Sequence, residues 1–302
     1  MNWWEELKGK VRLGEPLKAH TTFKIGGAAK FFIEPKDVDD LKLLLNLLKR
    51  YKIPFLIIGA GSNILVSDKG VNAAVVSLNS AYFKKIRFKN DYLEVGSGTC
   101  LSQLIFAAEK RGLAGLEFLI GIPGTVGGAL VMNAGISEKL KIKGLRAKNI
   151  GELVIDVTVI DHRGNVKNLN KNKIRFGCRS SNLSKYIILG CSIKTTKKSR
   201  KEIKKTIDRC LNYRLATQGL NWASAGCVFK NPSGDSAGRL IDLCGLKERK
   251  IGDAGISLKH ANFILNRGNA RSEDVFKLMD LMRKAVRDKY NIRLEHEIKI
   301  WQ

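Results

Sequence analysis

The chain has 302 residues, which at about 150 residues per domain suggests roughly two domains. Its 44% apolar and 27% charged residues, with 29 Gly and 5 Pro, exclude a disordered or collagen-like chain and indicate a globular protein with a sizeable core. The 54 Lys and Arg outnumber the 28 Asp and Glu, and the net charge of +26 favours anionic partners such as phosphates, nucleic acid or lipid headgroups without choosing among them.

The N-terminal residues and the cysteines predict a cytoplasmic protein. Charged side chains interrupt residues 1–14, so the apolar stretch of a signal peptide is missing. The 6 cysteines have no CxxC pattern or ligand-like spacing, which predicts free thiols in a reducing compartment and no metal site. Residues 118–137 are uncharged and long enough to span a bilayer, but their glycines, Pro123 and Asn133 favour a glycine-rich loop and short helix, so we expect no membrane insertion.

The first predicted elements are a strand, a helix and a strand between residues 30 and 58. The segment AKFFIEP at 29–35 predicts the first strand and precedes Asp37, a candidate N-cap for a helix over 38–51. Apolar residues at three-to-four spacing predict one buried face on that helix, and the run 53–58 predicts the next strand. The pattern is that of a β-α-β unit.

Shorter elements follow along the middle of the chain. Strands are predicted at 73–78, 84–88 and 92–98, and an amphipathic helix at 101–111. The runs 153–161 and 165–169 predict two strands, and the Gly-Asn pair between them is typical of a hairpin.

The C-terminal third begins with a strongly basic segment. Ile203, Ile207 and Leu211 predict one face of a helix there, which we interpret as the crossing into a further domain. Because no aromatic residues interleave its basic ones, we expect a solvated helix face and no nucleic-acid partner. The last helix is predicted to start at Ser272 as N-cap, and the tail 292–300 alternates like a strand.

Two glycine-rich segments are candidates for binding a phosphate-bearing ligand, because glycines let backbone N–H groups approach an anion closely. The first follows the strand 53–58 and comprises Gly59, Ala60, Gly61, Ser62 and Asn63. The second comprises Gly121, Ile122, Pro123, Gly124, Thr125, Gly127 and Gly128, followed by Asn133, Ala134 and Gly135. A helix N-terminus at the second segment would face the anion. The alternative interpretation is a tight turn for the first segment and close backbone packing for the second.

The chain carries five motifs in this order: GAGSNILV, GLEFLIGIPGTVGGALVMNAG, FGCRSS, SAGCVFKNP and LEHE. In this order they resemble the signature segments of the UDP-N-acetylenolpyruvoylglucosamine reductases, the MurB flavoenzymes of peptidoglycan precursor synthesis. The resemblance extends from His20 to Glu297, and the compact length of the chain is similar to that of the family's shorter form. It implies an α+β or α/β chain with a two-subdomain FAD-binding fold of the vanillyl-alcohol-oxidase (PCMH) type and a C-terminal α/β substrate domain. The expected parts are 1–70, 71–198, 199–291 and the terminal strand 292–302.

The resemblance also implies cofactors, substrate and residue roles. FAD would bind the two glycine segments, non-covalently because neither contains His or Cys, and NADPH would donate the hydride that converts UDP-N-acetylglucosamine enolpyruvate to UDP-N-acetylmuramate. Arg179 would contact the substrate carboxylate, Cys227 would donate a proton, and Glu297 would be the glutamate of the terminal LExE motif. Lys230 and Asn231 would face the diphosphate of the UDP-sugar.

Three features depart from the family pattern. Cys227 stands where Ser is usual, and a thiol can also donate a proton. Cys178 replaces the usual Tyr before the arginine, so any aromatic or hydroxyl contribution is missing there. The segment after Gly135 is longer than usual, which leaves the FAD contacts beyond it open.

The chemistry of the reaction is consistent with these roles. Hydride delivery to C3 builds negative charge at C2 and on the adjacent carboxylate, which a guanidinium stabilises before an acid protonates C2. A carboxylate such as Glu297 would have to be protonated or paired with a cation. Two alternatives stay open: a related flavin oxidase with another substrate, and a colourless basic protein that binds nucleic acid in a salt-dependent way.

Overall fold

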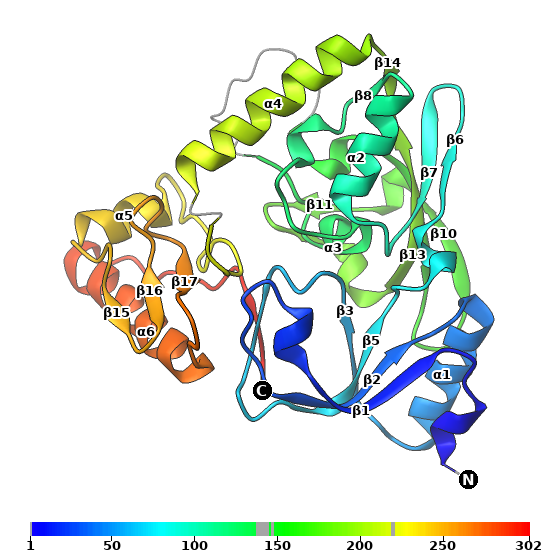
Figure 1. Ribbon diagram of the computed structural model, residues 1–302, viewed down its shortest axis with the longest axis horizontal. Helices are drawn as coiled ribbons and strands as arrows, with labels where there is room; N and C mark the ends of the chain where they lie inside the picture. Colours follow the sequence, from blue (N-terminus) through cyan, green and yellow to red (C-terminus); the bar gives the residue numbers. More distant parts are fainter. Residues whose placement is uncertain (1, 137–144, 146–147, 219–220) are drawn as a thin grey trace. The chain divides into compact units, whose positions relative to one another are not determined.

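The computed structural model describes residues 2–136, 145, 148–218 and 221–302. The chain forms two compact units, each built from segments distant in sequence (Figure 1). Unit 1 comprises Met1–Leu13, Phe31–Ala60 and Ala73–Asn212, and unit 2 comprises Gly14–Lys30, Gly61–Asn72 and Tyr213–Gln302. Two early segments therefore group with the C-terminal part of the chain, a grouping that the predicted boundaries did not contain. Most of the longer segment after Gly135, residues 137–144 and 146–147, lies outside the described residues.

The helices and strands agree with most of the sequence-based expectations. Among the described residues the helices are α1 (Val38–Arg50), α2 (Leu101–Lys110), α3 (Val126–Val131), α4 (Arg200–Thr217), α5 (Ala237–Leu243) and α6 (Ser272–Tyr290). The strands are β1 (Lys10–Pro16), β2 (Ala28–Glu34), β3 (Phe55–Ile58), β4 (Ile64–Val66), β5 (Val71–Ser77), β6 (Ile86–Phe88), β7 (Tyr92–Gly96), β8 (Leu113–Ala114), β9 (Val154–Ile160), β10 (Val166–Asn170), β11 (Phe176–Gly177), β12 (Ser180–Ser181), β13 (Ile187–Lys194), β14 (Thr196–Lys197), β15 (Lys250–Ile251), β16 (Ala254–Ile256), β17 (Ile264–Asn266) and β18 (Lys299–Trp301).

Helix α1 packs against a sheet with the strand order β1-β2-β5-β3. The side chain of Asp37 accepts a hydrogen bond from Asp40 N at 3.0 Å, which confirms the predicted N-cap. Leu41, Leu44 and Leu48 form the buried face and share a core with residues of β2 and β5. Strand β5 lies between β2 and β3 and pairs with β3 in parallel, so the two strands of the predicted β-α-β unit share a sheet without being neighbours.

The second large sheet of unit 1 has five strands in the order β10-β9-β13-β7-β6. All its neighbouring strands are antiparallel, and the pairing of Ile160 with Val166 confirms the predicted hairpin. Helices α2 and α3 cover this sheet (Figure 1), and Leu104, Leu130 and Ile193 are buried between them. The sheet therefore fixes the position of the second glycine segment, which leads into α3.

Unit 2 packs α5 and α6 on the small sheet β15-β16-β17. The C-terminal strand β18 pairs in parallel with β4, with Lys299 opposite Ile64. Along the tail Leu294 and Ile298 are buried whereas Arg293 and Glu295 are exposed, as the alternation predicted. Regular strand structure is nevertheless limited to β18.

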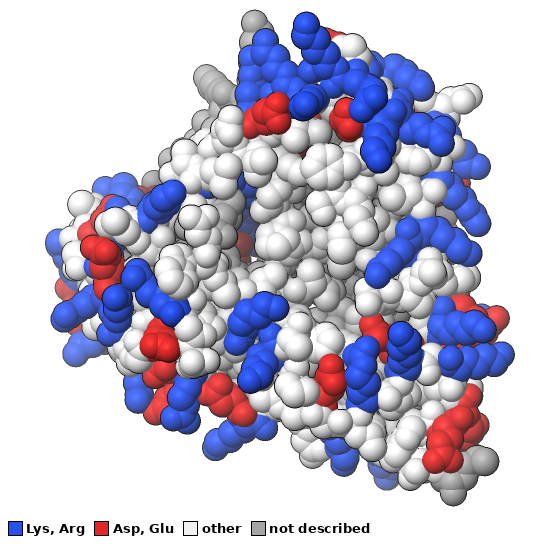
Figure 2. Space-filling view, viewed as in Figure 1, with Lys and Arg blue, Asp and Glu red and all other residues white. Residues whose placement is uncertain are grey.

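The excess of basic side chains is distributed over both units. Figure 2 shows Lys and Arg over much of the visible surface of each unit, with fewer Asp and Glu among them. On α4 the basic residues Lys201, Lys204 and Lys205 are exposed while Ile203 and Ile207 are buried, consistent with the predicted solvated helix face. In the described ranges no helix is both long and apolar enough to cross a membrane.

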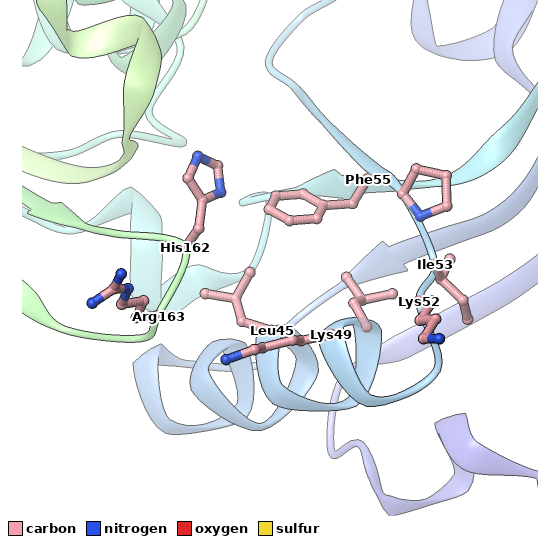
Figure 3. A pocket seen from close by; sticks show the side chains of 9 residues that line it. Leu45, Lys49, Lys52, Ile53, Phe55, His162 and Arg163 are labelled. Atoms are coloured by element: carbon pink, nitrogen blue, oxygen red, sulfur yellow. The ribbon is translucent and has the colours of Figure 1, made fainter.

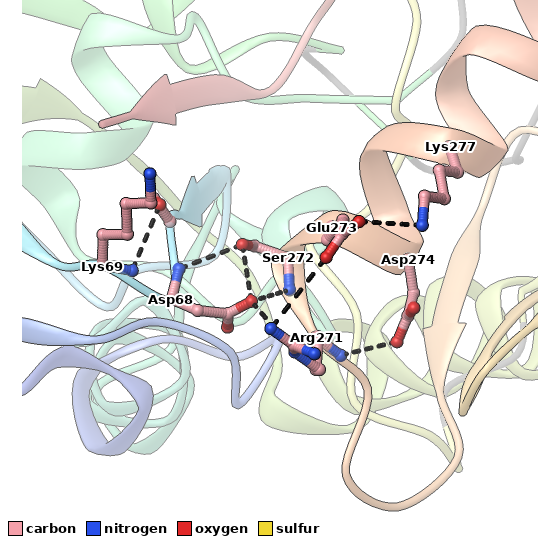
Figure 4. A network of polar contacts seen from close by, with 8 residues as sticks. Asp68, Lys69, Arg271, Ser272, Glu273, Asp274 and Lys277 are labelled. Atoms are coloured by element: carbon pink, nitrogen blue, oxygen red, sulfur yellow. Dashed lines mark hydrogen bonds and ion pairs between the residues drawn. The ribbon is translucent and has the colours of Figure 1, made fainter.

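The first residue of α6 is bonded to a carboxylate from a distant loop. Asp68 Oδ2 accepts hydrogen bonds from Ser272 N and Ser272 Oγ, each at 2.9 Å, and Asp68 N donates to Ser272 Oγ at 3.0 Å (Figure 4). Helix α6 begins at Ser272 and its N-cap is Arg271, so the prediction that Ser272 is the N-cap was wrong by one position. The sequence could not indicate its partner, which lies 204 residues earlier.

We expect Ser272→Ala to lower the free energy of unfolding by about 1–2 kcal/mol, because a side chain only 4% exposed loses one donated and one accepted hydrogen bond. Urea denaturation measures the change. Ser233→Ala, at an exposed position of the same unit, is the control and should change stability by less than about 0.5 kcal/mol. Equal stabilities of the two variants would contradict the role given to Ser272.

Candidate active site

The second glycine segment is organised by hydrogen bonds at the start of α3. Thr125 caps this helix by accepting a bond from Gly128 N at 3.3 Å. The amides of Val126 and Gly127 donate to Thr99 O at 2.9 Å and to Ser97 O at 2.8 Å. Because these amides are bonded to carbonyls, and α3 has only six residues, the predicted anion site at its N-terminus is not formed by them.

Two glycines of the candidate FAD segments lie beside the Thr125 side chain in unit 1. A Cβ on Gly59 would lie 2.6 Å from Thr125 Oγ1, so only glycine permits this approach. A Cβ on Gly128 would meet only the same oxygen, at 3.6 Å, so space is open there. Gly128 and Pro123 are exposed, and Gly124 is half-buried. This part of the segment is therefore accessible and carries no charged side chain.

Other residues of the second segment serve close backbone packing. A Cβ on Gly127 would lie 3.1 Å from Ser97 Cβ, and one on Gly135 would lie 2.1 Å from Lys148 O. Ala134 O accepts a hydrogen bond from Ile150 N at 2.9 Å. Close backbone packing, the alternative interpretation of this segment, therefore explains why glycine is present at positions 127 and 135, which were predicted as FAD contacts.

The first glycine segment contributes to both units. Gly59 and Ala60 belong to unit 1, whereas Gly61, Ser62 and Asn63 belong to unit 2. In unit 2, Asn63 Nδ2 donates to Glu297 O at 3.1 Å, and Asn63 O accepts from Lys299 N at 2.9 Å. Asn63, predicted as an FAD residue, thus also holds the C-terminal segment that carries Glu297.

The segments that carry two of the predicted catalytic residues pair in unit 2. Val228 O, one residue after Cys227, accepts a hydrogen bond from Glu297 N at 2.8 Å. Cys227 is half-buried and forms an isolated bridge with Phe263. Cys227 and Glu297 therefore lie on neighbouring extended segments, although 70 residues separate them in sequence.

The predicted diphosphate-binding residues lie on the same segment. Lys230 N donates to Glu295 O at 2.8 Å, and its exposed side chain forms an ion pair with Glu295 at 3.1 Å. Asn231 Oδ1 accepts a bond from Ala237 N at 3.0 Å, at the start of α5. Lys230 offers an accessible cation, while Asn231 also has a structural contact.

His296, beside Glu297, is a neutral packing residue. Its ring lies 5.5 Å from the ring of Phe229, measured between centroids. Burial lowers the pKa of His296, and the positive charge of Arg283 lowers it further. Because the ordinary pKa of histidine is about 6.5, the lowered value keeps the ring neutral at pH 7. His296 therefore does not supply a cation for the Glu297 carboxylate.

Arg179 lies in the two-residue turn between β11 and β12 of unit 1. Its φ of 49° is in the left-handed region, where a non-glycine residue costs about 1–2 kcal/mol. Cys178, the other turn residue, is exposed. The three predicted catalytic residues are thus divided, with Arg179 in unit 1 and Cys227 and Glu297 in unit 2.

A separate hollow on unit 1 contains none of the predicted site residues. It has a volume of about 560 Å³ and lies between the end of α1, the start of β3 and the β9–β10 turn (Figure 3). Its lining residues are Leu45, Leu48, Lys49, Lys52, Ile53, Pro54, Phe55, His162 and Arg163.

Comparison with known proteins relates the whole chain to one family. The model of the FAD binding domain matches residues 29–170, and the model of the UDP-N-acetylenolpyruvoylglucosamine reductase C-terminal domain matches residues 218–301. The UDP-N-acetylenolpyruvoylglucosamine reductase 2 of Symbiobacterium thermophilum is 41% identical over 97% of this chain and 92% of that protein. The chain belongs to the UDP-N-acetylenolpyruvoylglucosamine reductase family. This finding confirms the resemblance seen in the motifs.

Further members of the family support the same assignment. The reductase of Clostridioides difficile is 37% identical over 97% of this chain and 94% of that protein. The crystal structure of the MurB reductase of Thermus caldophilus is similar with a TM-score of 0.81 and 35% identity, covering 98% of this chain and 100% of that one. The predicted fold, an FAD-binding region followed by a C-terminal α/β domain, is confirmed.

We expect Gly128→Val to weaken FAD binding by at least about tenfold, which corresponds to about 1.4 kcal/mol. The added side chain would occupy the open side of the candidate flavin surface, while a Cβ at this position has no close neighbour in the protein. Titration of the apoprotein with FAD measures the affinity, and thermal unfolding of the apoprotein checks the fold. A folded variant that binds FAD as tightly as the native chain would remove Gly128 from the flavin site.

Proposed function

We propose that this chain catalyses the NADPH-dependent reduction of UDP-N-acetylglucosamine enolpyruvate to UDP-N-acetylmuramate with non-covalently bound FAD. The observation that carries the proposal is the pairing of the Cys227 and Glu297 segments, through the bond from Glu297 N to Val228 O at 2.8 Å. It brings together the segments of two motif residues that lie far apart in the sequence, in a chain related to reductases over nearly its full length. A cytoplasmic location is part of the same proposal.

The surface around Thr125 would hold the FAD. Gly59 and Gly128 keep that surface free of side chains, and the exposed Pro123 and half-buried Gly124 extend it. Bound FAD supplies the transfer of hydride from NADPH to C3 of the enolpyruvyl group. The remaining chemistry falls to side chains of this protein.

Arg179 would bind the substrate carboxylate. Its guanidinium offers two parallel N–H donors to the two carboxylate oxygens. Negative charge increases on this carboxylate and on C2 as the hydride reaches C3, so the cation stabilises the transition state more than the ground state. The exposed ammonium of Lys230 would pair with the diphosphate of the same substrate.

Cys227 would deliver the proton that completes the reaction. The Sγ–H bond breaks as a C–H bond forms at C2, and solvent later restores the thiol. Glu297 lies on the neighbouring segment, where an ionised carboxylate would oppose the charge that develops at C2. We propose that Glu297 acts in its protonated form or paired with a cation.

Steady-state turnover tests the proposal. The purified holoprotein should oxidise NADPH only when the enolpyruvyl UDP-sugar is present, and the product should contain one more hydride and one more proton than the substrate. Equal NADPH oxidation without that substrate, with oxygen as acceptor, would instead support an oxidase of the wider flavoprotein class.

A further inference from the structure

The hairpin that carries Arg179 is too small to be stable alone. Its strands β11 and β12 have two residues each, and Arg179 in the turn has a strained φ of 49°. An isolated two-stranded hairpin is marginal even when its strands are longer. Contacts with the rest of the protein must therefore hold the hairpin, and with it the backbone of Arg179, in place.

Two side chains connect both strands of this hairpin to the end of α3. On the first strand, Gly177 O accepts a hydrogen bond from Asn133 Nδ2 at 3.0 Å. On the second strand, Ser181 Oγ donates to the carbonyls of Leu130 and Val131, at 2.9 and 3.0 Å. Both contacts lie within unit 1.

Asn133 is itself fixed by the helix end and by a second backbone bond. Ala134 N donates to Ala129 O at 2.8 Å, which gives α3 a Schellman-type C-terminus with Asn133 at the left-handed position, φ 45°. Asn133 Oδ1 accepts from Gly151 N at 3.1 Å. Its amide therefore joins the Gly151 and Gly177 backbones, and a Cβ on Gly151 would lie only 2.7 Å from Asn133 Oδ1.

We infer that Asn133 and Ser181 are positioning residues, which orient Arg179 through the hairpin and couple it to the segment proposed to hold FAD. This inference rests on the proposed role of Arg179. It also gives Asn133, predicted from the sequence as an FAD contact, a different use for its side chain. Neither residue needs to touch the substrate for this role.

Asn133→Gly separates the side chain from the backbone conformation. Glycine is the residue best suited to a left-handed C-terminal position, so the helix end is kept while both amide hydrogen bonds are lost. We expect reoxidation of reduced flavin by the enolpyruvyl substrate to slow by about tenfold, because small displacements of a binding group reduce rates strongly. FAD affinity and flavin reduction by NADPH should stay within about twofold of the native values. Ser181→Ala should give the same pattern.

Asn291→Gly is the matched control. Asn291 ends α6 in the same left-handed conformation, with φ 54°, so the same Asn-to-Gly exchange is made at a helix end in unit 2. We expect it to leave both half-reactions unchanged. A double-mutant cycle that combines Asn133→Gly with Arg179→Lys is decisive. If Asn133 acts through Arg179, adding Asn133→Gly to the Arg179→Lys variant should slow reoxidation by less than about a further twofold.

Three results would overturn the inference. The first is native-like reoxidation in both Asn133→Gly and Ser181→Ala. The second is an equal loss of FAD binding and of both half-reactions. The third is that the rate losses of Asn133→Gly and Arg179→Lys multiply in the double variant. The proposed role of Arg179 is tested separately in the same series. A native-like Arg179→Lys removes that role and the inference with it, whereas a slow Arg179→Lys beside a native-like Asn133→Gly removes the inference alone.

Discussion

Cys227→Ala is expected to abolish most of the turnover while keeping the flavin half of the reaction. General acids contribute about 100-fold or more to rates, so reoxidation of the reduced flavin by the enolpyruvyl substrate should slow by at least that factor. FAD binding and flavin reduction by NADPH should be unchanged, because neither needs a proton at C2. Rapid mixing of the reduced protein with substrate measures the step.

Cys227→Ser tests whether the proton or the thiol itself matters. A hydroxyl can donate from the same position, so this variant should recover much of the lost rate, whereas a redox or nucleophilic cysteine would not tolerate the exchange. Thiols lose their proton in the alkaline range and serine hydroxyls do not, so the native step should slow as the pH rises and the serine variant should lack that decline. An alanine variant as fast as the native protein would assign the proton to another group or to water.

Arg179→Lys should lower turnover by at least about tenfold, equivalent to about 1.4 kcal/mol in the barrier. Lysine keeps one positive charge but loses the planar pair of donors that matches a carboxylate. Reduction of the flavin by NADPH should be nearly unaffected, since Arg179 is proposed to act on the other substrate.

Lys201→Arg serves as the reverse exchange at an exposed position of α4 and should leave turnover unchanged. Native turnover in Arg179→Lys would remove Arg179 from the site. A parallel loss of FAD from that variant would show that it acts on the fold of unit 1.

Local patterns predicted the helices and the main hairpin because their causes are local. The N-cap at Asp37 and the apolar face containing Leu41 and Leu44 are both contained in one short segment, and both are present in α1. The alternating tail also predicted its buried face, at Leu294 and Ile298, but before β18 it forms one isolated bridge, between His296 and Phe229, and β18 alone is a regular strand. An alternating pattern predicts which side chains are buried, but it does not predict how many backbone hydrogen bonds form with a neighbouring strand.

The candidate site was predictable only as a set of motifs, because its contacts are long-range. Composition marked the glycines but could not separate Gly128, which has open space beside it, from Gly127, which packs against Ser97. The bonds of Asn63 to the tail and of Asn133 to the hairpin depend on partners 234 and 44 residues away. Gly96 and Gly98, on either side of Ser97, indicate a tight loop, but both were included in the strand predicted at 92–98.

A single-turnover experiment tests the central claim most directly. The holoprotein is reduced anaerobically with one equivalent of NADPH and then mixed with UDP-N-acetylglucosamine enolpyruvate while the flavin absorbance is followed. We predict that NADPH bleaches the flavin and that the substrate restores its absorbance with formation of UDP-N-acetylmuramate. A protein that binds no FAD on reconstitution, or whose reduced flavin is not reoxidised by this substrate, would contradict the account.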